Sequence, residues 1–230
     1  MADWPEFESE RLAGMLLRVD LQEQRYLAAG EHANVVNHLL RSASAACLSD
    51  REEEGVALIE RAAGRTVEWV RAAREGKARP SSFAELAFTR GWLAICVCPP
   101  PGAEQAAINC LAMTAWRPAG QVHNARIVAA AYLGDWATVD AAGKLCELSD
   151  AGLGVPLKRF LIALVAHDEP GMRTSILTWL QEKMDATMTH EWGAYNEVPI
   201  EVNGALALAD RAGRTVPVAS NRVLTRFRAG

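Results

Sequence analysis

The sequence predicts an all-α protein, and three observations support this prediction. Apolar residues recur with the 3.6-residue period of a helix along the chain, whereas alternating, strand-like patterns are nearly absent. Three turns, near Pro101, Gly134 and Asp168, lie 33 and 34 residues apart, the spacing of helical-hairpin repeats of tetratricopeptide size. Half of the residues are apolar and 23% are charged, the balance of a globular protein. We expect a single domain of about nine or ten helices, stacked as antiparallel hairpins in the manner of an α-solenoid.

The N-terminal part, residues 1–75, is expected to contain three helices. The first should begin at Asp3 and end at Gly30, because a proline lies in its first turn and glycine commonly follows a helix. The second is expected over residues 32–48. The third follows directly, with a weak point at Gly64, since glycine disfavours a helix interior.

Acidic residues gather where the third helix begins. Asp50 is predicted to cap this helix, and Glu52, Glu53 and Glu54 occupy its first turn, where the helix dipole favours carboxylates. Three consecutive helical residues cannot all point inward, so part of this cluster should be exposed. The cluster is either an ordinary charged helix start or an acidic docking patch. We retain these four residues as candidate partner-binding residues.

The central part, residues 81–190, is expected to contain the hairpin repeats, after a linker at 76–80 that is rich in glycine, proline and basic residues. Ser82 and Glu85 have capping-box spacing, which predicts a helix start. The expected hairpins span residues 92–113, 125–148 and 160–184. Each hairpin contains one tryptophan in a comparable position that we expect to be buried in the core. These tryptophans are Trp92, Trp136 and Trp179.

The C-terminal part, residues 197–228, is expected to begin with a helix over 197–213 that has Pro199 in its first turn. The face of this helix that carries Val202, Leu206, Ala209 and Asp210 mixes apolar and polar groups. The segment 215–219 is the one credible extended stretch, and Ser220 is positioned to cap a short terminal helix.

No pattern of residues predicts a catalytic site, a metal site or a cofactor. The histidines lack partners at helical spacing, no Glu-x-x-His occurs, and neither a Gly-x-Ser-x-Gly elbow nor a complete glycine-rich phosphate loop is found. The five cysteines include no Cys-x-x-Cys pair, so we interpret them as small core residues.

Overall charge and hydropathy exclude two classes of partner. A net charge of −4 and a pI near 5.8 argue against a nucleic-acid binder. No apolar stretch has the length of a membrane span, and the acidic first residues are unlike a signal peptide, so we expect a cytoplasmic protein. Residues 1–54 have a net charge of −6 and residues 211–230 a net charge of +5. These ends either steer a charged partner or pair with one another.

Three aromatic residues stand in segments that read as loops. Trp116 precedes an Arg-Pro pair, and Trp192 and Tyr195 flank a Gly-Ala pair. Aromatic residues of this kind are enriched at the centres of protein interfaces, but they also fill cores. We retain all three as candidate partner-binding residues, with burial in the core as the alternative.

The second half of the chain resembles the immunity protein 49 family, all-helical bacterial proteins that neutralise a cognate polymorphic toxin. The stretches that carry the resemblance are residues 91–95, 130–136, 160–168, 198–213 and 216–220. In the family, an Ala-Leu-Ala helix ending in glycine precedes a Val-x-Val-x-Ser segment and a final Tyr-Leu-Pro. Here Val223, Leu224 and Thr225 stand at that ending, without the proline. The resemblance spans roughly residues 50–225 and implies protein binding without catalysis.

These observations favour a non-catalytic protein that binds a protein partner and inhibits a cognate toxin domain by covering its active surface. One alternative is a helical-repeat scaffold or regulator that binds a peptide in a groove. A second alternative, from another class, is a helical enzyme with an enclosed pocket, which converging polar groups would favour.

Overall fold

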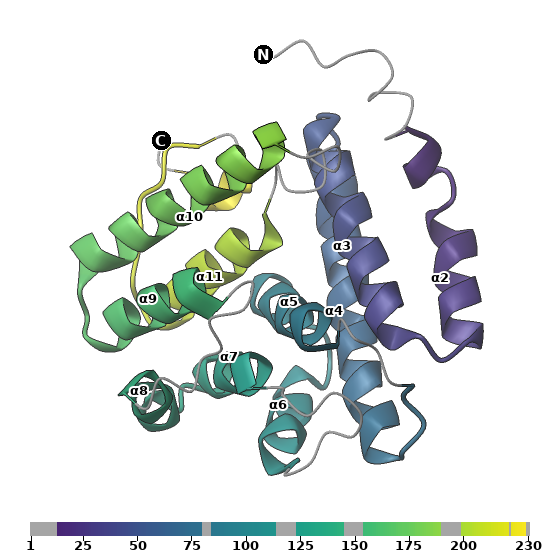
Figure 1. Cartoon of the computed structure of the whole chain (residues 1–230), viewed down its shortest axis with the longest axis horizontal. Helices are drawn as coiled ribbons and strands as arrows, with labels where there is room; N and C mark the ends of the chain where they lie inside the picture. Colours follow the sequence, from purple (N-terminus) through teal and green to yellow (C-terminus); the bar gives the residue numbers. More distant parts are fainter. Residues whose placement is uncertain are drawn as a thin grey trace.

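The computed structural model describes residues 13–79, 84–113, 123–144, 154–189, 199–220 and 222–228. Within these ranges the regular structure is helical, and no strand forms beyond an isolated bridge between Val218 and Arg228. The predicted all-α class is therefore confirmed, and Figure 1 shows helices packed against one another throughout. None of the described helices combines the length and the apolar character that crossing a bilayer requires.

The helices agree closely with the predicted turns. They are α2 (Val19–Ala28), α3 (His32–Leu48), α4 (Glu52–Arg74), α5 (Ala84–Val97), α6 (Ala103–Ala112), α7 (His123–Leu133), α8 (Trp136–Lys144), α9 (Gly154–Val165), α10 (Glu169–Thr189) and α11 (Ile200–Arg211). A 3₁₀ helix spans Thr225–Phe227. The turns predicted near Pro101, Gly134 and Asp168 separate α5 from α6, α7 from α8 and α9 from α10.

Three details of the N-terminal helices differ from the prediction. The described part of the first helix is interrupted by a turn at residues 17–18, and its predicted start lies outside the described residues. Arg51, not Asp50, occupies the N-cap of α4, because Asp50 adopts a φ of 56° within the tight turn after α3. Gly64 does not interrupt α4. Its neighbours Ala62 and Ala63 are fully buried, so packing outweighs the helix cost of one glycine.

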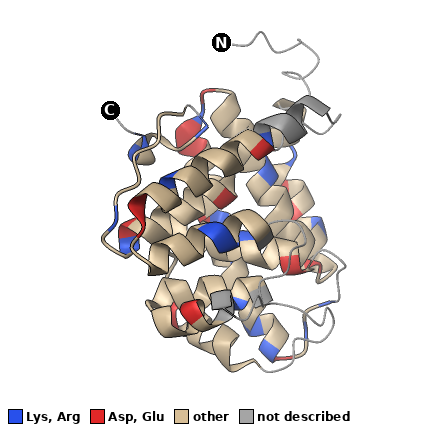
Figure 2. Cartoon of the chain, turned by 60° about the vertical axis from the view of Figure 1, so that its left-hand side comes forward, with Lys and Arg blue, Asp and Glu red and all other residues tan. Residues whose placement is uncertain are grey.

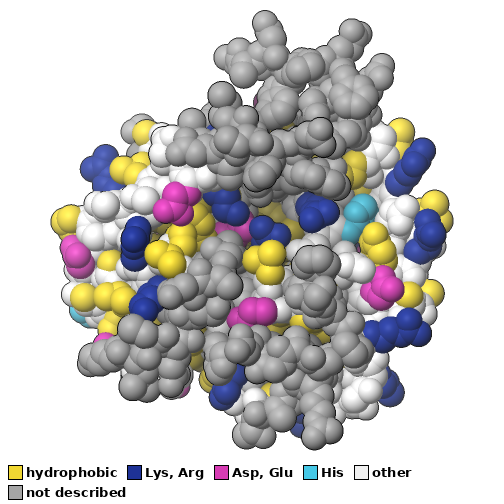
Figure 3. Space-filling view, in the orientation of Figure 1, with side chains coloured by type: hydrophobic (Ala, Val, Ile, Leu, Met, Phe, Trp, Pro, Cys, Tyr) yellow, Lys and Arg dark blue, Asp and Glu magenta, His cyan; other side chains and the backbone are white. Residues whose placement is uncertain are grey.

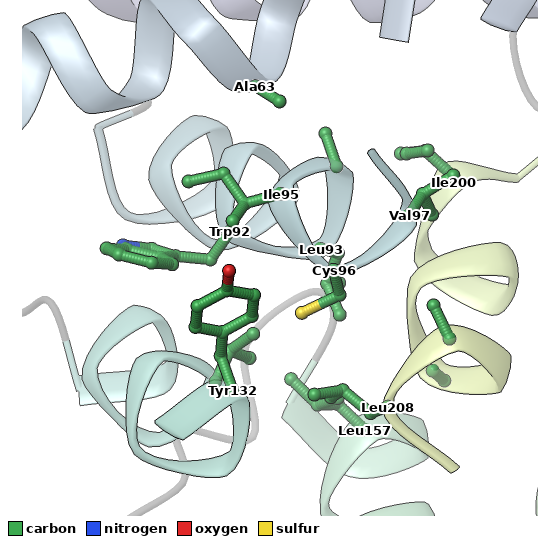
Figure 4. Close-up of a cluster of buried hydrophobic side chains, with 14 of the residues drawn as sticks. Ala63, Trp92, Leu93, Ile95, Cys96, Val97, Tyr132, Leu157, Ile200 and Leu208 are labelled. Carbon is green, nitrogen blue, oxygen red and sulfur yellow. The ribbon is translucent and has the colours of Figure 1, made fainter. Parts of the chain in front are cut away.

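Helix α5 lies at the centre of the fold, where α3, α4, α7 and α11 pack around it. Every residue from Gly91 to Val97 is buried. Figure 4 shows Trp92 beside Tyr132 of α7, and Val97 beside Ile200 of α11. The backbones of α5 and α11 approach closely because Gly204 has no side chain: a Cβ there would lie 2.5 Å from the Leu93 Cβ.

Helix α11 is deeply buried: all ten residues from Ile200 to Ala209 are buried. Its two buried polar residues have partners. Glu201 accepts a hydrogen bond from Arg90 Nε at 2.8 Å and pairs with Lys183 Nζ at 3.3 Å. Asn203 donates to the Pro199 carbonyl at 2.9 Å and accepts from the Leu224 amide at 2.8 Å. Both buried polar residues are thus paired where neighbouring segments cover α11.

The predicted core residues are mostly confirmed. Trp92 and Trp179 are buried, whereas Trp136, at the start of α8, is half-buried and packs against the edge of the core. Cys96 and Cys110 are also buried. The remaining described cysteines are half-buried, and Cys146 lies outside the described residues.

Glu85 caps a helix other than the one that the capping-box spacing predicts. Its Oε1 atom accepts a hydrogen bond from the backbone amide of Asn124 at 2.9 Å, in the first turn of α7. Ser82, the other member of the predicted capping box, lies outside the described residues. At the other end of the chain, Ser220 Oγ accepts from the Arg222 amide at 3.2 Å, ahead of the short 3₁₀ helix.

Candidate partner-binding groove

The structure divides the predicted acidic cluster at the start of α4. Asp50 and Glu53 are exposed, as expected for at least part of the cluster. Glu54 is half-buried and pairs with Arg51 on the preceding turn. Glu52 faces the C-terminal segment, so the cluster does not form one continuous acidic patch.

Glu52 links the start of α4 to the C-terminal segment. Its carboxylate accepts hydrogen bonds from the Thr225 amide at 2.7 Å and the Thr225 hydroxyl at 2.6 Å, and lies 3.7 Å from Arg228 Nη2. Burial raises the pKa of Glu52, but the Thr225 hydrogen bonds and the Arg228 charge outweigh it and hold the pKa below its usual range. At Glu52, therefore, an acidic residue of the N-terminal part pairs with the basic C-terminal segment, which is the second of the two alternatives for these charges.

The three aromatic candidates, Trp116, Trp192 and Tyr195, lie outside the described residues. Figure 2 shows acidic and basic residues interspersed along the helices in that view. In Figure 3 charged side chains are interspersed with hydrophobic ones on the face that is shown. Charge alone therefore does not single out a docking face in these views.

A groove lies between the C-terminal half of α4 and helix α6, which run side by side in Figure 1. Its volume is about 590 Å³. From α4 it is lined by two valines, two arginines and the adjoining Glu75, and from the other side by the turn before α6 and by three residues of α6. These lining residues are Val67, Val70, Arg71, Arg74, Glu75, Pro101, Gly102, Gln105, Ala106 and Asn109.

The local sequence explains each wall of the groove. The last turn of α4 carries Arg71 and Arg74, where the helix dipole favours cations. Gly102, with a φ of 82°, reverses the chain and begins α6. Gln105 and Asn109 are four residues apart and share one face of α6, and Gln105 Nε2 donates to Asn109 Oδ1 at 3.3 Å.

The two groove arginines differ from the other arginines of α4. Arg61 and Arg65 both pair with the buried Glu23 of α2, the latter through Nε at 2.6 Å. The side chains of Arg71 and Arg74 are exposed and form no ion pair or hydrogen bond with the described residues, although the charge of Arg71 acts on Glu75. The groove therefore presents two guanidinium groups whose donors are open to a ligand.

The acid at the groove is held mainly by a lysine. Glu75 accepts a hydrogen bond from Lys77 Nζ at 2.6 Å. The Lys77 hydrogen bond and charge, and to a smaller extent the charge of Arg71, lower the pKa of Glu75. The floor beneath the charges is apolar, since Val70 and Ala106 are buried and Val67 is half-buried.

The groups that line the groove are mixed in character. They comprise two guanidinium groups, the Glu75 carboxylate, two side-chain amides and apolar groups, and include no cysteine, histidine or hydroxyl. Elsewhere, burial raises the pKa of the Cys96 and Cys110 thiols to about 12, which disfavours a thiolate nucleophile. Within the described ranges, no three His, Cys, Asp or Glu side chains gather in a way that could hold a metal ion.

Sequence reasoning missed this groove, although one signal was present. Arg71 and Arg74 follow an apolar stripe at helical spacing, but such residues usually form a solvated helix end. The residues of the opposite wall begin at Pro101, thirty positions after Arg71. Only the packing of α4 against α6 brings the two walls together.

The comparisons with known proteins add no further assignment. No protein-family model matches the chain, and neither a curated protein nor a solved structure matches it.

Proposed function

We propose that this chain is a non-catalytic protein-binding protein and that the α4–α6 groove receives a segment of its partner. The observation that supports the proposal is the groove itself, with an apolar floor, exposed guanidinium groups on one wall and side-chain amides on the other. Its volume lies within the range of about 300–1,000 Å³ that is typical of ligand sites. A binding surface of this composition gains free energy from apolar burial and specificity from its polar rim.

The class of partner that we propose is a cognate toxin domain, which the chain would bind in the cytoplasm and inhibit by covering its active surface. The resemblance to the immunity protein 49 family supports this class of partner. Asp50 and Glu53, the exposed members of the acidic cluster, remain proposed contacts outside the groove. A scaffold that binds a peptide in the same groove is the second candidate, and it would leave the activity of its partner unchanged.

Filling the groove tests the proposal. Gln105→Trp together with Asn109→Trp places two bulky side chains on the groove face of α6. The matched control, Glu104→Trp with Ile108→Trp, places the same side chains on exposed positions of the same helix that do not line the groove. Circular dichroism establishes that both double variants retain the helical fold.

The measurement is affinity purification of the full chain from its source cells with quantitative mass spectrometry, followed by calorimetry with each purified partner. We expect the partner to bind the wild type and the control, and to lose affinity at least about tenfold for the filled groove. Equal affinity of both double variants would show that the groove is not the binding site. Titrating the chain into a purified toxin domain then separates inhibitor from scaffold, since only an inhibitor abolishes its activity.

A further inference from the structure

We infer that the occupant of the α4–α6 groove is an extended, acidic segment of the partner protein. This inference rests on the proposed function and adds the chemistry of the ligand. Three features support it: two exposed guanidinium groups, a pair of side-chain amides with an acceptor and a donor to spare, and a small apolar floor without aromatic residues.

The first feature is the open charge of Arg71 and Arg74. Along α4, the preceding arginines at 61 and 65 are held by Glu23, so they are committed to the fold. The two groove arginines have no such partner among the described residues. A guanidinium binds a carboxylate through two parallel hydrogen bonds, which gives both strength and orientation. Because Glu75 is already bonded to Lys77, the local charge available to a ligand is positive.

The second feature is the amide pair on α6. The hydrogen bond from Gln105 Nε2 to Asn109 Oδ1 leaves the Gln105 carbonyl oxygen as an acceptor and the Asn109 amino group as a donor. The amide pair therefore offers one acceptor and one donor along α6, the two groups that the backbone of an extended segment can bond.

The third feature is the floor, which distinguishes a protein segment from a nucleic acid. Val67, Val70 and Ala106 offer small apolar contacts, and none of the lining residues is aromatic. Single-stranded nucleic acids are held by bases stacked on aromatic side chains within a strongly basic channel. This chain has a net charge of −4, which opposes a long polyanion but not a short acidic segment held by two arginines.

Fluorescence anisotropy with synthetic peptides tests the inference on the full chain. One fluorescein-labelled peptide alternates glutamate with valine or alanine, and a second of equal length has lysine in place of every glutamate. The groove variant is Arg71→Glu with Arg74→Glu. The control, Arg25→Glu with Arg173→Glu, makes the same charge change at exposed positions on α2 and α10.

We expect the wild type to bind the acidic peptide in preference to the basic one, with weaker binding at higher salt. The affinity should fall at least about tenfold in the groove variant and by less than about twofold in the control. Arg71→Lys with Arg74→Lys should restore binding only in part, because lysine lacks the bidentate geometry. Three results would overturn the inference. The wild type could prefer the basic peptide, or both Glu variants could lose affinity equally. A single-stranded oligonucleotide could also displace the labelled acidic peptide at a lower concentration than unlabelled acidic peptide does.

The partner from the groove-filling experiment separates this inference from the proposed function. A partner that is lost from the tryptophan-filled groove but binds the Arg71→Glu/Arg74→Glu variant normally would leave the groove as the binding site and refute the acidic segment. A partner that binds the tryptophan-filled variant with the same affinity as the wild type would refute the proposed function, whatever the peptide experiment shows.

Discussion

Replacing Glu201 with glutamine should destabilise the fold strongly, because its carboxylate is buried between two cations. Glu201 is 3% exposed, and the side chains of Arg90 and Lys183 are 18% and 15% exposed. Burial alone would raise the pKa of Glu201, but the charges of Lys183 and Arg90 outweigh it and lower the pKa from 4.5 to about 2. At about 1.36 kcal/mol per pH unit, this difference corresponds to ~3 kcal/mol. Removing one partner of a buried ion pair costs about 3–5 kcal/mol, in agreement.

The lowered pKa of Glu201 also sets the pH range in which its carboxylate stops contributing to the free energy of unfolding. Because the folded carboxyl titrates below its ordinary value of 4.5, its contribution is complete above that pH and declines as the pH falls towards 2. Glu201→Gln lacks this contribution at every pH, so the free energies of unfolding of variant and wild type should converge on acidification.

Urea unfolding followed by circular dichroism, at pH 7 and at intervals down to pH 2.5, measures this difference. The control is Glu53→Gln, which removes an exposed carboxylate and should change stability by less than about 0.5 kcal/mol. A Glu201→Gln protein that is as stable as the control at pH 7 would refute the view that this ion cluster stabilises the packing of α11.

Three further predictions concern other parts of the core. Burial raises the pKa of Glu85 to about 7, so the wild type should lose stability as the pH rises from 4.5 to 7. Glu85→Gln should be more stable than the wild type at pH 8 by about 1–2 kcal/mol after allowance for partial exposure. Urea titrations in which the stability difference between the two proteins does not change with pH would refute this. Gly204→Ala should lower stability by about 1–3 kcal/mol because the new Cβ would meet α5. Gly64→Ala should raise stability by up to about 1 kcal/mol, because the space around Gly64 is open and alanine favours a helix. Thermal unfolding that ranks the two variants in the opposite order would contradict the packing. Trp92→Ala should lower the free energy of unfolding by about 3–5 kcal/mol, and Trp136→Ala should lower it clearly less because Trp136 is half-buried. Equal losses for the two variants, measured from denaturant midpoints, would contradict this ranking.

The local features of the fold could be predicted because they depend on residues close together in the chain. Helical periodicity is a property of about ten consecutive residues, so the existence of α3, α4 and the later helices follows from the sequence. Turn residues act equally locally: Gly134 takes a φ of 75° in a turn that the spacing predicts. The burial of Trp92 and Trp179 follows from their place on apolar helical faces.

The tertiary structure alone decided which faces meet. Glu201 looks like an ordinary polar residue on an amphipathic helix until Arg90, 111 positions away, reaches it. Glu85 has the spacing of a cap for its own helix, yet it accepts a hydrogen bond from an amide in the first turn of α7. Arg71 reads as a solvated helix end until α6 packs beside it and makes a groove. The physical reason is common to all three: hydrogen bonds and ion pairs between distant segments depend on how helices pack, and apolar periodicity specifies that a face is buried but not which neighbour buries it.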